Sequence, residues 1–128
     1  MAGNVSVLNK TKGTLPRVPF SRIKDAALGT DYELSLVFVS DTESRKINMR
    51  HRGKDYVPNV LSFELDETSG EIFINPAEAR RQASHFGRSY TSMIAFLYIH
   101  GLCHLKGMQH GSTMEKSEAR LRKKFGVD

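Results

Sequence analysis

The order of apolar and polar positions along the chain predicts an alternation of strands and helices. Segment 33–39 alternates at first and then becomes continuously apolar, with β-branched and aromatic residues, which is typical of a strand. In segment 20–28 the apolar positions recur at helical spacing, and Gly29 follows as a helix stop. Strands are expected at 5–9, 33–39, 59–63 and 71–74. Helices are expected at 20–28, 41–49 and 76–86, from 89 or 91 past 104, and from 112 onward.

Turn-forming and capping residues separate these elements. Segment 66–70 is rich in turn residues and predicts a hairpin between the last two strands. Pro76 stands at the first position of its helix, where proline is tolerated. Ser112 and Glu115 have the spacing of a capping box at the start of the final helix. The element order predicts a single α+β domain over residues 1–128, in which helices cover a small sheet.

The composition fits such a domain and indicates the kind of partner and the cellular compartment to expect. Apolar residues make up 39% and charged residues 26% of the chain, which excludes a disordered or collagen-like protein. The formal charge of +5 favours a polyanionic partner such as nucleic acid. A single cysteine, Cys103, excludes an intrachain disulfide, and no apolar segment reaches the length of a membrane span. We therefore expect a cytoplasmic protein.

Three of the five histidines fall within segment 100–110. His100 and His104 lie four residues apart at the end of an apolar helix, so both imidazoles share one helix face. Gly107 then supplies a helix stop, which lets the chain bring His110 back to the same place. Three imidazoles predict one bound metal ion, and Zn²⁺ is the ion that we expect. A fourth tetrahedral position is left for water. Copper, nickel and cobalt also bind well to three imidazoles, so the sequence does not exclude them as the bound metal.

The other candidate ligands have no partner at ligand spacing. His51 and His85 are isolated in the sequence and are expected at the surface. Cys103 is turned by roughly 100° from His104 around the predicted helix, so it is expected in the core rather than on the ion.

The spacing His100-x3-His104-x5-His110 belongs to a wider pattern that covers roughly residues 36–110. The further blocks are Asn48, then Arg52-Gly53-Lys54-Asp55, then Asn59-Val60-Leu61-Ser62-Phe63, and finally Gly70-Glu71-Ile72. Together these blocks resemble the YbeY family of bacterial ribosomal-RNA maturation factors. The resemblance implies a zinc-dependent, single-strand-specific endoribonuclease that acts on ribosomal-RNA precursors, with the small ribosomal subunit or its proteins as a partner. It also implies a mixed sheet of about four strands, covered by about five helices.

Three positions depart from the pattern of that family. Gln109 stands where an acidic residue usually precedes the third histidine, and a carboxylate there could orient a ligand or a water. Glu71 replaces an aspartate, and Val57-Pro58 replaces a Pro-Thr pair. None of these changes touches the three histidines or Arg52.

Arg52 is the catalytic candidate, because it lies in a block that resembles the family. A fixed guanidinium can offer a bidentate fork to the charge that develops on a phosphate. Lys54 is a weaker candidate for contact with an RNA backbone, and Ser62 is a candidate for supporting the site from its strand.

Two other functions remain open at this point. A zinc peptidase would need a glutamate as general base after the first histidine, where this chain has Gly101. A non-catalytic ribosome-binding module with a structural zinc fits less well, because three ligands leave a coordination position open. The basic residues of the last helix are expected to form a solvated face rather than a phosphate-binding stripe: Lys116, Arg120, Arg122, Lys123 and Lys124.

Overall fold

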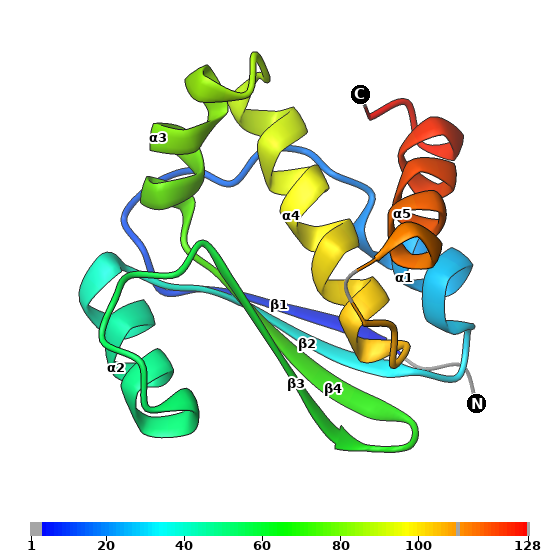
Figure 1. Cartoon of the computed structure of the whole chain (residues 1–128), viewed down its shortest axis with the longest axis horizontal. Helices are drawn as coiled ribbons and strands as arrows, with labels where there is room; N and C mark the ends of the chain where they lie inside the picture. The colour runs from blue at the N-terminus through cyan, green and yellow to red at the C-terminus, as the bar shows by residue number, and fades with distance from the viewer. Residues whose placement is uncertain (1–3, 110, 128) are drawn as a thin grey trace.

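A mixed sheet forms the base of the fold in the computed structural model, which describes residues 4–109 and 111–127 (Figure 1). Within that part of the chain the sheet has four strands: β1 (Val5–Asn9), β2 (Glu33–Phe38), β3 (Val60–Asp66) and β4 (Ser69–Ile74). Their order is β1-β2-β4-β3, with β1, β2 and β4 parallel and β3 antiparallel to β4. The expected strand number and mixed pairing are confirmed, and β3 lies at one edge of the sheet.

The hairpin predicted around 66–70 joins β3 to β4. Oδ1 of Asp66 accepts a hydrogen bond of 2.8 Å from the backbone N–H of Thr68, which closes the turn. A bulge between Glu64 and Asp66 shifts the register near the turn. The connection is shorter than predicted, because pairing continues to Asp66 opposite Ser69.

The described residues form five helices, as expected: α1 (Phe20–Leu28), α2 (Asp41–Arg52), α3 (Pro76–His85), α4 (Tyr90–Leu105) and α5 (Ser112–Lys124). α4 crosses one face of the sheet and contacts β3 and β4, while α1, α3 and α5 pack against α4. α2 lies at the left of Figure 1 and is joined to α3 by the ion pair of Asp41 and Arg81. None of the helices in this part of the chain combines the length and apolar character needed to span a membrane. The α+β architecture is thus confirmed.

α4 is the central helix of the core. Its apolar residues are buried around most of its circumference, because Ile94 and Tyr98 are fully buried and so are Ile99 and Leu102. Because α4 is packed on most of its sides, its position relative to the sheet is fixed. Polar side chains on its last turns are therefore placed by packing of the apolar residues that precede them.

Gly101 sets how closely α4 approaches the sheet. A Cβ at this position would lie 2.9 Å from Oγ of Ser62 on β3 and 3.0 Å from Cδ1 of Ile72 on β4. Both distances are shorter than van der Waals contact, so a side chain here would push the helix outward. The absence of a side chain lets the helix turn around position 101 rest directly on the strands.

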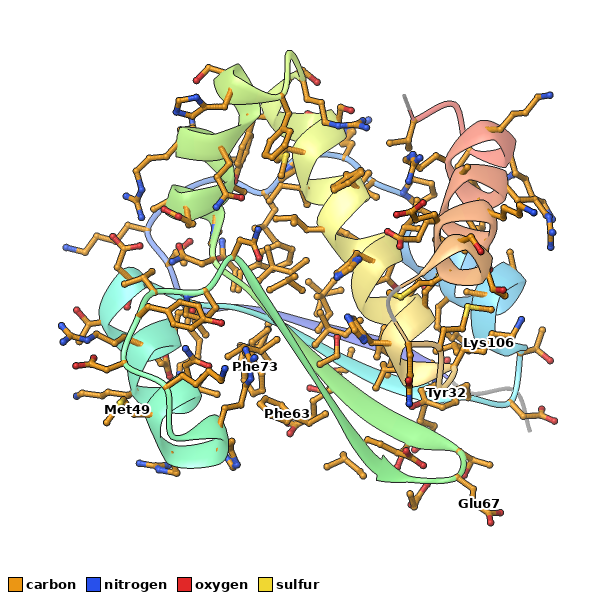
Figure 2. The ribbon with its side chains drawn as sticks, in the orientation of Figure 1. Tyr32, Met49, Phe63, Glu67, Phe73 and Lys106 are labelled. Carbon is orange, nitrogen blue, oxygen red and sulfur yellow. The ribbon has the colours of Figure 1, made fainter. Side chains whose placement is uncertain are left out.

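The opposite face of the sheet carries two phenylalanines. Phe63 and Phe73 lie side by side there, with ring centroids 6.0 Å apart (Figure 2). They alternate along their strands with Ser62 and Ile72, whose side chains meet α4. The ring of His51, on α2, lies 5.0 Å from that of Phe63, so α2 contacts this second face.

The end of α2 differs from the prediction. The helix continues beyond Met49 to Arg52, where Gly53 adopts the left-handed conformation (φ 64°) and accommodates the end. The last turn of α2 is polar and basic, so no apolar periodicity marked its end in the sequence. Arg52 is consequently anchored on a helical turn rather than in a loop.

The start of α5 corrects a second prediction. The helix begins at Ser112 as expected, but its N-cap is Gly111 and no side chain caps it. Ser112 lies inside the first turn, where its hydroxyl is no longer in the capping position for the N–H of Glu115. The capping-box prediction for Ser112 and Glu115 is therefore wrong.

Candidate active site

His100 and His104 lie on the last turns of α4 with their rings on one side of the helix. Their Nε2 atoms are 3.2 Å apart, and their ring planes are nearly perpendicular, at 88°, with centroids 4.7 Å apart. Four-residue spacing places both side chains on the same helix face. The structure therefore brings these two predicted ligands together.

A carboxylate from another helix contacts His100. Oε1 of Glu118, on α5, lies 3.1 Å from Nδ1 of His100, and Glu118 is only 6% exposed. An ionised carboxylate can only accept, so Nδ1 of His100 donates this hydrogen bond. In a neutral imidazole the lone pair is then on Nε2, the atom next to His104. Glu118 sets the tautomer of His100, but the sequence pattern did not indicate Glu118 as a residue of the site.

The histidine pair has the spacing expected of two ligands of one zinc ion. With Zn–N distances of about 2.0–2.1 Å, two corners of a tetrahedron are about 3.3 Å apart. The two Nε2 atoms, at 3.2 Å, agree with that value. A carboxylate on the second ring nitrogen of a ligating histidine is also the usual arrangement at such sites. The chemistry of this donor set fits zinc.

The third predicted ligand, His110, lies outside the described residues. Among residues 4–109 and 111–127, no three or more His, Cys, Asp or Glu side chains are arranged to hold a metal ion. The described residues therefore supply two fitting donors, His100 and His104.

Both histidines open into a cavity of about 480 Å³. It lies between the end of α2, the outer edge of β3 and the end of α4. Its lining residues are Arg52, Tyr56, Asn59, Val60, Leu61, Ser62, Glu64, His100, His104 and Leu105. The fold thus places the predicted catalytic arginine and two of the predicted metal ligands in the same cavity.

Arg52 is held at this cavity by two neighbours. Its Nη1 donates to Oδ1 of Asn48 at 3.3 Å and to the hydroxyl of Tyr56 at 3.1 Å. Asn48 is fully buried, and its Nδ2 donates to the carbonyl of Tyr56 at 3.2 Å. One buried amide therefore positions both the arginine and the loop that follows α2. No described residue accepts a hydrogen bond from Nη2 or Nε of Arg52. The N–H groups on this side of the guanidinium can therefore donate to an anion.

The two weaker candidates are placed differently. Ser62 donates a hydrogen bond of 3.2 Å to the carbonyl of Gly101, which ties β3 to the helix turn between the two histidines. Lys54 is exposed and is not among the residues that line the cavity. Ser62 thus supports the site, whereas Lys54 lies outside it.

The remaining candidate ligands lie where the sequence predicted. Cys103 is 1% exposed, and burial raises the pKa of its thiol, which disfavours the thiolate that a metal ligand requires. His51 and His85 are both exposed. The expectation of a core cysteine and two surface histidines is confirmed.

Fold and site together define a class of protein. It is a small α+β domain in which a histidine pair and an arginine face one cavity, an arrangement suited to hydrolysis. The family model described as Endoribonuclease YbeY matches residues 10–125. The chain therefore belongs to the YbeY endoribonuclease family, as the blocks in its sequence suggested.

Individual relatives agree with this assignment. The Endoribonuclease YbeY of Halalkalibacterium halodurans is 36% identical over an alignment of 118 positions, which covers 80% of this chain and 74% of that protein. The Endoribonuclease YbeY of Pelotomaculum thermopropionicum is 32% identical over an alignment of 133 positions, which covers 95% of this chain and 88% of that protein. The solution structure of TM1509 from Thermotoga maritima shares the fold, with a TM-score of 0.68 over 96% of this chain and 90% of that one, at 24% identity. The family is one of nucleases, which are hydrolases.

Proposed function

We propose that this chain is a zinc-dependent endoribonuclease that cuts single-stranded RNA during the processing of ribosomal-RNA precursors in the cytoplasm. Membership of the YbeY family supports RNA as the substrate, and the net charge of +5 suits a polyanion. The observation that carries the proposal is the pair of Nε2 atoms, 3.2 Å apart, in the cavity that Arg52 also lines. The small ribosomal subunit or its proteins would present the precursor.

The residues of the site have distinct roles in this proposal. His100 and His104, with His110, would hold one zinc ion, which when bound lowers the pKa of a water molecule and polarises a phosphoryl oxygen. Glu118 keeps the proton of His100 on Nδ1, so that Nε2 is presented to the site. Arg52 binds the phosphate through Nη2 and Nε and stabilises the negative charge that grows during attack.

Position 101 argues for phosphodiester rather than peptide cleavage. A zinc peptidase of the helical His-x3-His type carries its glutamate base directly after the first histidine. Here Gly101 is pressed against Ser62 and Ile72, so that no carboxylate has room at this position. Arg52, the cation that lines the same cavity as the histidines, is instead a partner for phosphate.

The proposal is tested with protein purified without a histidine tag and loaded with zinc. We expect it to cut an unstructured RNA and to leave both duplex RNA and casein intact. In His104→Ala we expect zinc and cleavage to be lost together. Cleavage that persists undiminished in His104→Ala would show that the nuclease activity does not belong to this site.

A second variant separates metal binding from catalysis. Arg52→Ala should retain zinc but lose at least about a hundredfold in kcat, because it removes a charge aimed at the transition state. Lys54→Ala is the matched control, since Lys54 is a nearby cation that does not line the cavity. Normal turnover in Arg52→Ala would remove Arg52 from the mechanism.

A further inference from the structure

A second cavity, of about 370 Å³, adjoins the first one beside His100. It lies between α4 and α5, and its lining residues are Asn59, Val60, Phe96, Leu97, His100, Gly111, Met114, Glu115, Glu118 and Arg122. Asn59, Val60 and His100 line both cavities. The two cavities therefore adjoin at these three residues, with Arg52 lining one and Arg122 the other, and we call the pair the trough.

Arg122 differs from the other basic residues of α5. Lys116, Arg120, Lys123 and Lys124 are exposed, as expected of a solvated helix face, whereas Arg122 is half-buried and lines the trough. It is the only lysine or arginine among the described residues that line the second cavity. The expectation of a solvated face is thus correct for four of these residues and wrong for Arg122.

The guanidinium of Arg122 is held in place without a carboxylate. Its Cζ lies 5.2 Å from the centroid of the Phe96 ring, over which Arg88 also lies at 4.4 Å. No acidic side chain of a described residue forms an ion pair with Arg122. The buried carboxylate of this cavity, Glu118, is bonded to His100 instead. Contact with an aromatic ring restrains a guanidinium but leaves its N–H groups for another acceptor.

The outer edge of β3 connects the two halves of the trough. The N–H of Asn75 donates to the carbonyl of Asn59, and pairing with β4 continues from there in antiparallel register. In such a ladder alternate residues face away from the partner strand, so the backbone groups of Val60, Ser62 and Glu64 point outward. All three residues line the trough. Their N–H groups are donors for the oxygens of an extended strand lying along this edge.

We propose that Arg122 binds a backbone phosphate of the RNA at a distance from the scissile phosphate, so that the strand lies along the edge of β3 between Arg52 and Arg122. This inference rests on the proposed nuclease function and specifies how its substrate is held. Phe96 is a positioning residue, because it restrains the guanidinium of Arg122. An anchor on each side of the histidines requires a substrate that extends in both directions from the cut bond, and this favours internal cleavage of a chain over removal of end nucleotides.

The test compares two variants of equal charge in the zinc-loaded protein. Arg122→Gln removes the cation in the trough, and Lys123→Gln removes an exposed cation one residue further along α5. The binding probe is a fluorescein-labelled 2′-O-methyl RNA of about twelve nucleotides, checked on a gel to remain intact, and its Kd is measured by anisotropy at several salt concentrations. Thermal unfolding confirms that both variants are folded.

We expect Arg122→Gln to raise Kd about tenfold and to lower the slope of log Kd against log salt by about one, the signature of one lost phosphate contact. Lys123→Gln should change Kd less than about twofold. In cleavage assays KM should rise for Arg122→Gln while kcat stays within about twofold, and the rise should disappear with an RNA of about four nucleotides, which cannot reach both arginines. Phe96→Leu should also raise the Kd of the twelve-nucleotide probe, as Arg122→Gln does, because the guanidinium of Arg122 loses its restraint.

Equal effects of Arg122→Gln and Lys123→Gln, or unchanged binding in Arg122→Gln, would overturn this inference while leaving the nuclease proposal intact. Failure of the unaltered protein to bind or cut any RNA would instead refute the proposed function itself. The two failures are therefore distinguishable in one set of measurements.

Discussion

At the scale of single residues, the state of His100 depends on one carboxylate. Glu118 is buried and accepts a hydrogen bond from Nδ1 of His100 over 3.1 Å. This bond fixes the orientation of the ring and increases the electron density on Nε2, the atom that faces His104. A carboxylate so deeply placed needs such a partner, because burying an unpaired charge is costly.

We predict that Glu118→Gln weakens zinc binding by about 10- to 100-fold, measured by competition with a zinc chelator. The amide has the same shape but no charge, so it no longer strengthens the imidazole as a ligand. Glu115→Gln is the control, since Glu115 is exposed on the same helix and lines the same cavity. Equal zinc affinity in the two variants would show that Glu118 does not act through His100.

Some residues of the site could be predicted from the sequence, and others could not. The spacing of His100 and His104 encodes their proximity directly, because four residues make about one helical turn. Arg52 was indicated by a resemblance, whereas nothing local in the sequence links position 118 to position 100. A signal for Glu118 was nevertheless present. It follows Met114 by four residues and precedes Leu121 by three, so it is a charged residue within the buried stripe of α5.

At the scale of elements, the contact between α4 and the sheet sets the position of the histidines. We predict that Gly101→Ala destabilises the fold by about 1 kcal/mol. The gain in helix propensity, about 1 kcal/mol, is outweighed by crowding against Ser62 and Ile72, which costs about 1–3 kcal/mol. Urea unfolding measures the change. Zinc affinity should fall in parallel, because the shifted helix carries His100 and His104.

The control for this variant is the double substitution Ser62→Ala with Gly101→Ala. It removes the atom nearest to the added Cβ, 2.9 Å away, and should recover part of the lost stability. A Gly101→Ala protein that is more stable than the parent and binds zinc normally would contradict the close-approach argument.

A second element-scale prediction concerns the junction between α2 and α3. Oδ1 of Asp41 accepts hydrogen bonds from Arg81 at 2.6 Å and from Asn75 at 2.7 Å, and these bonds lower the pKa of Asp41, with Arg81 as the main cause. Because the pKa of Asp41 is lower in the folded state than in the unfolded state, where it is about 3.9, the ionised carboxylate stabilises the fold at pH values above the unfolded pKa. This contribution is lost as the pH falls through the pKa of the folded state.

We therefore expect Asp41→Asn to reduce stability at neutral pH and to have no effect at acid pH. The difference should be no more than about 1 kcal/mol, because the ion pair with Arg81 is exposed to solvent. Urea unfolding of both proteins between pH 7 and pH 2 measures it. A difference that stays constant down to the lowest pH would show that the charge of Asp41 does not contribute.

The elements themselves were largely predictable, since their apolar periodicity is local. The errors fell at the end of α2, at the turn between β3 and β4 and at the N-cap of α5, where most residues are polar and carry no periodic signal. The strand order could not be derived from local pattern, because β4 pairs with both β2 and β3 and thus separates strands that are consecutive in the sequence. Such long-range pairing depends on the packing of the whole sheet.

At the scale of the whole molecule, three separate parts of the chain meet at one trough. The end of α2 contributes Arg52, β3 contributes the edge, and the adjoining faces of α4 and α5 contribute the histidines and Arg122. Because α4 is also the core helix, the fold and the site depend on the same packing. Zinc held there would stabilise the folded protein, since the unfolded chain has no preformed site.

X-ray absorption at the zinc edge, on protein purified without a histidine tag, reports the ligands of the proposed metal site. We predict one zinc ion per chain, with three imidazole nitrogens and one oxygen at about 2.0–2.1 Å. A sulfur scatterer at about 2.3 Å, a fourth protein ligand in place of the oxygen, or an unchanged spectrum in His110→Ala would contradict it.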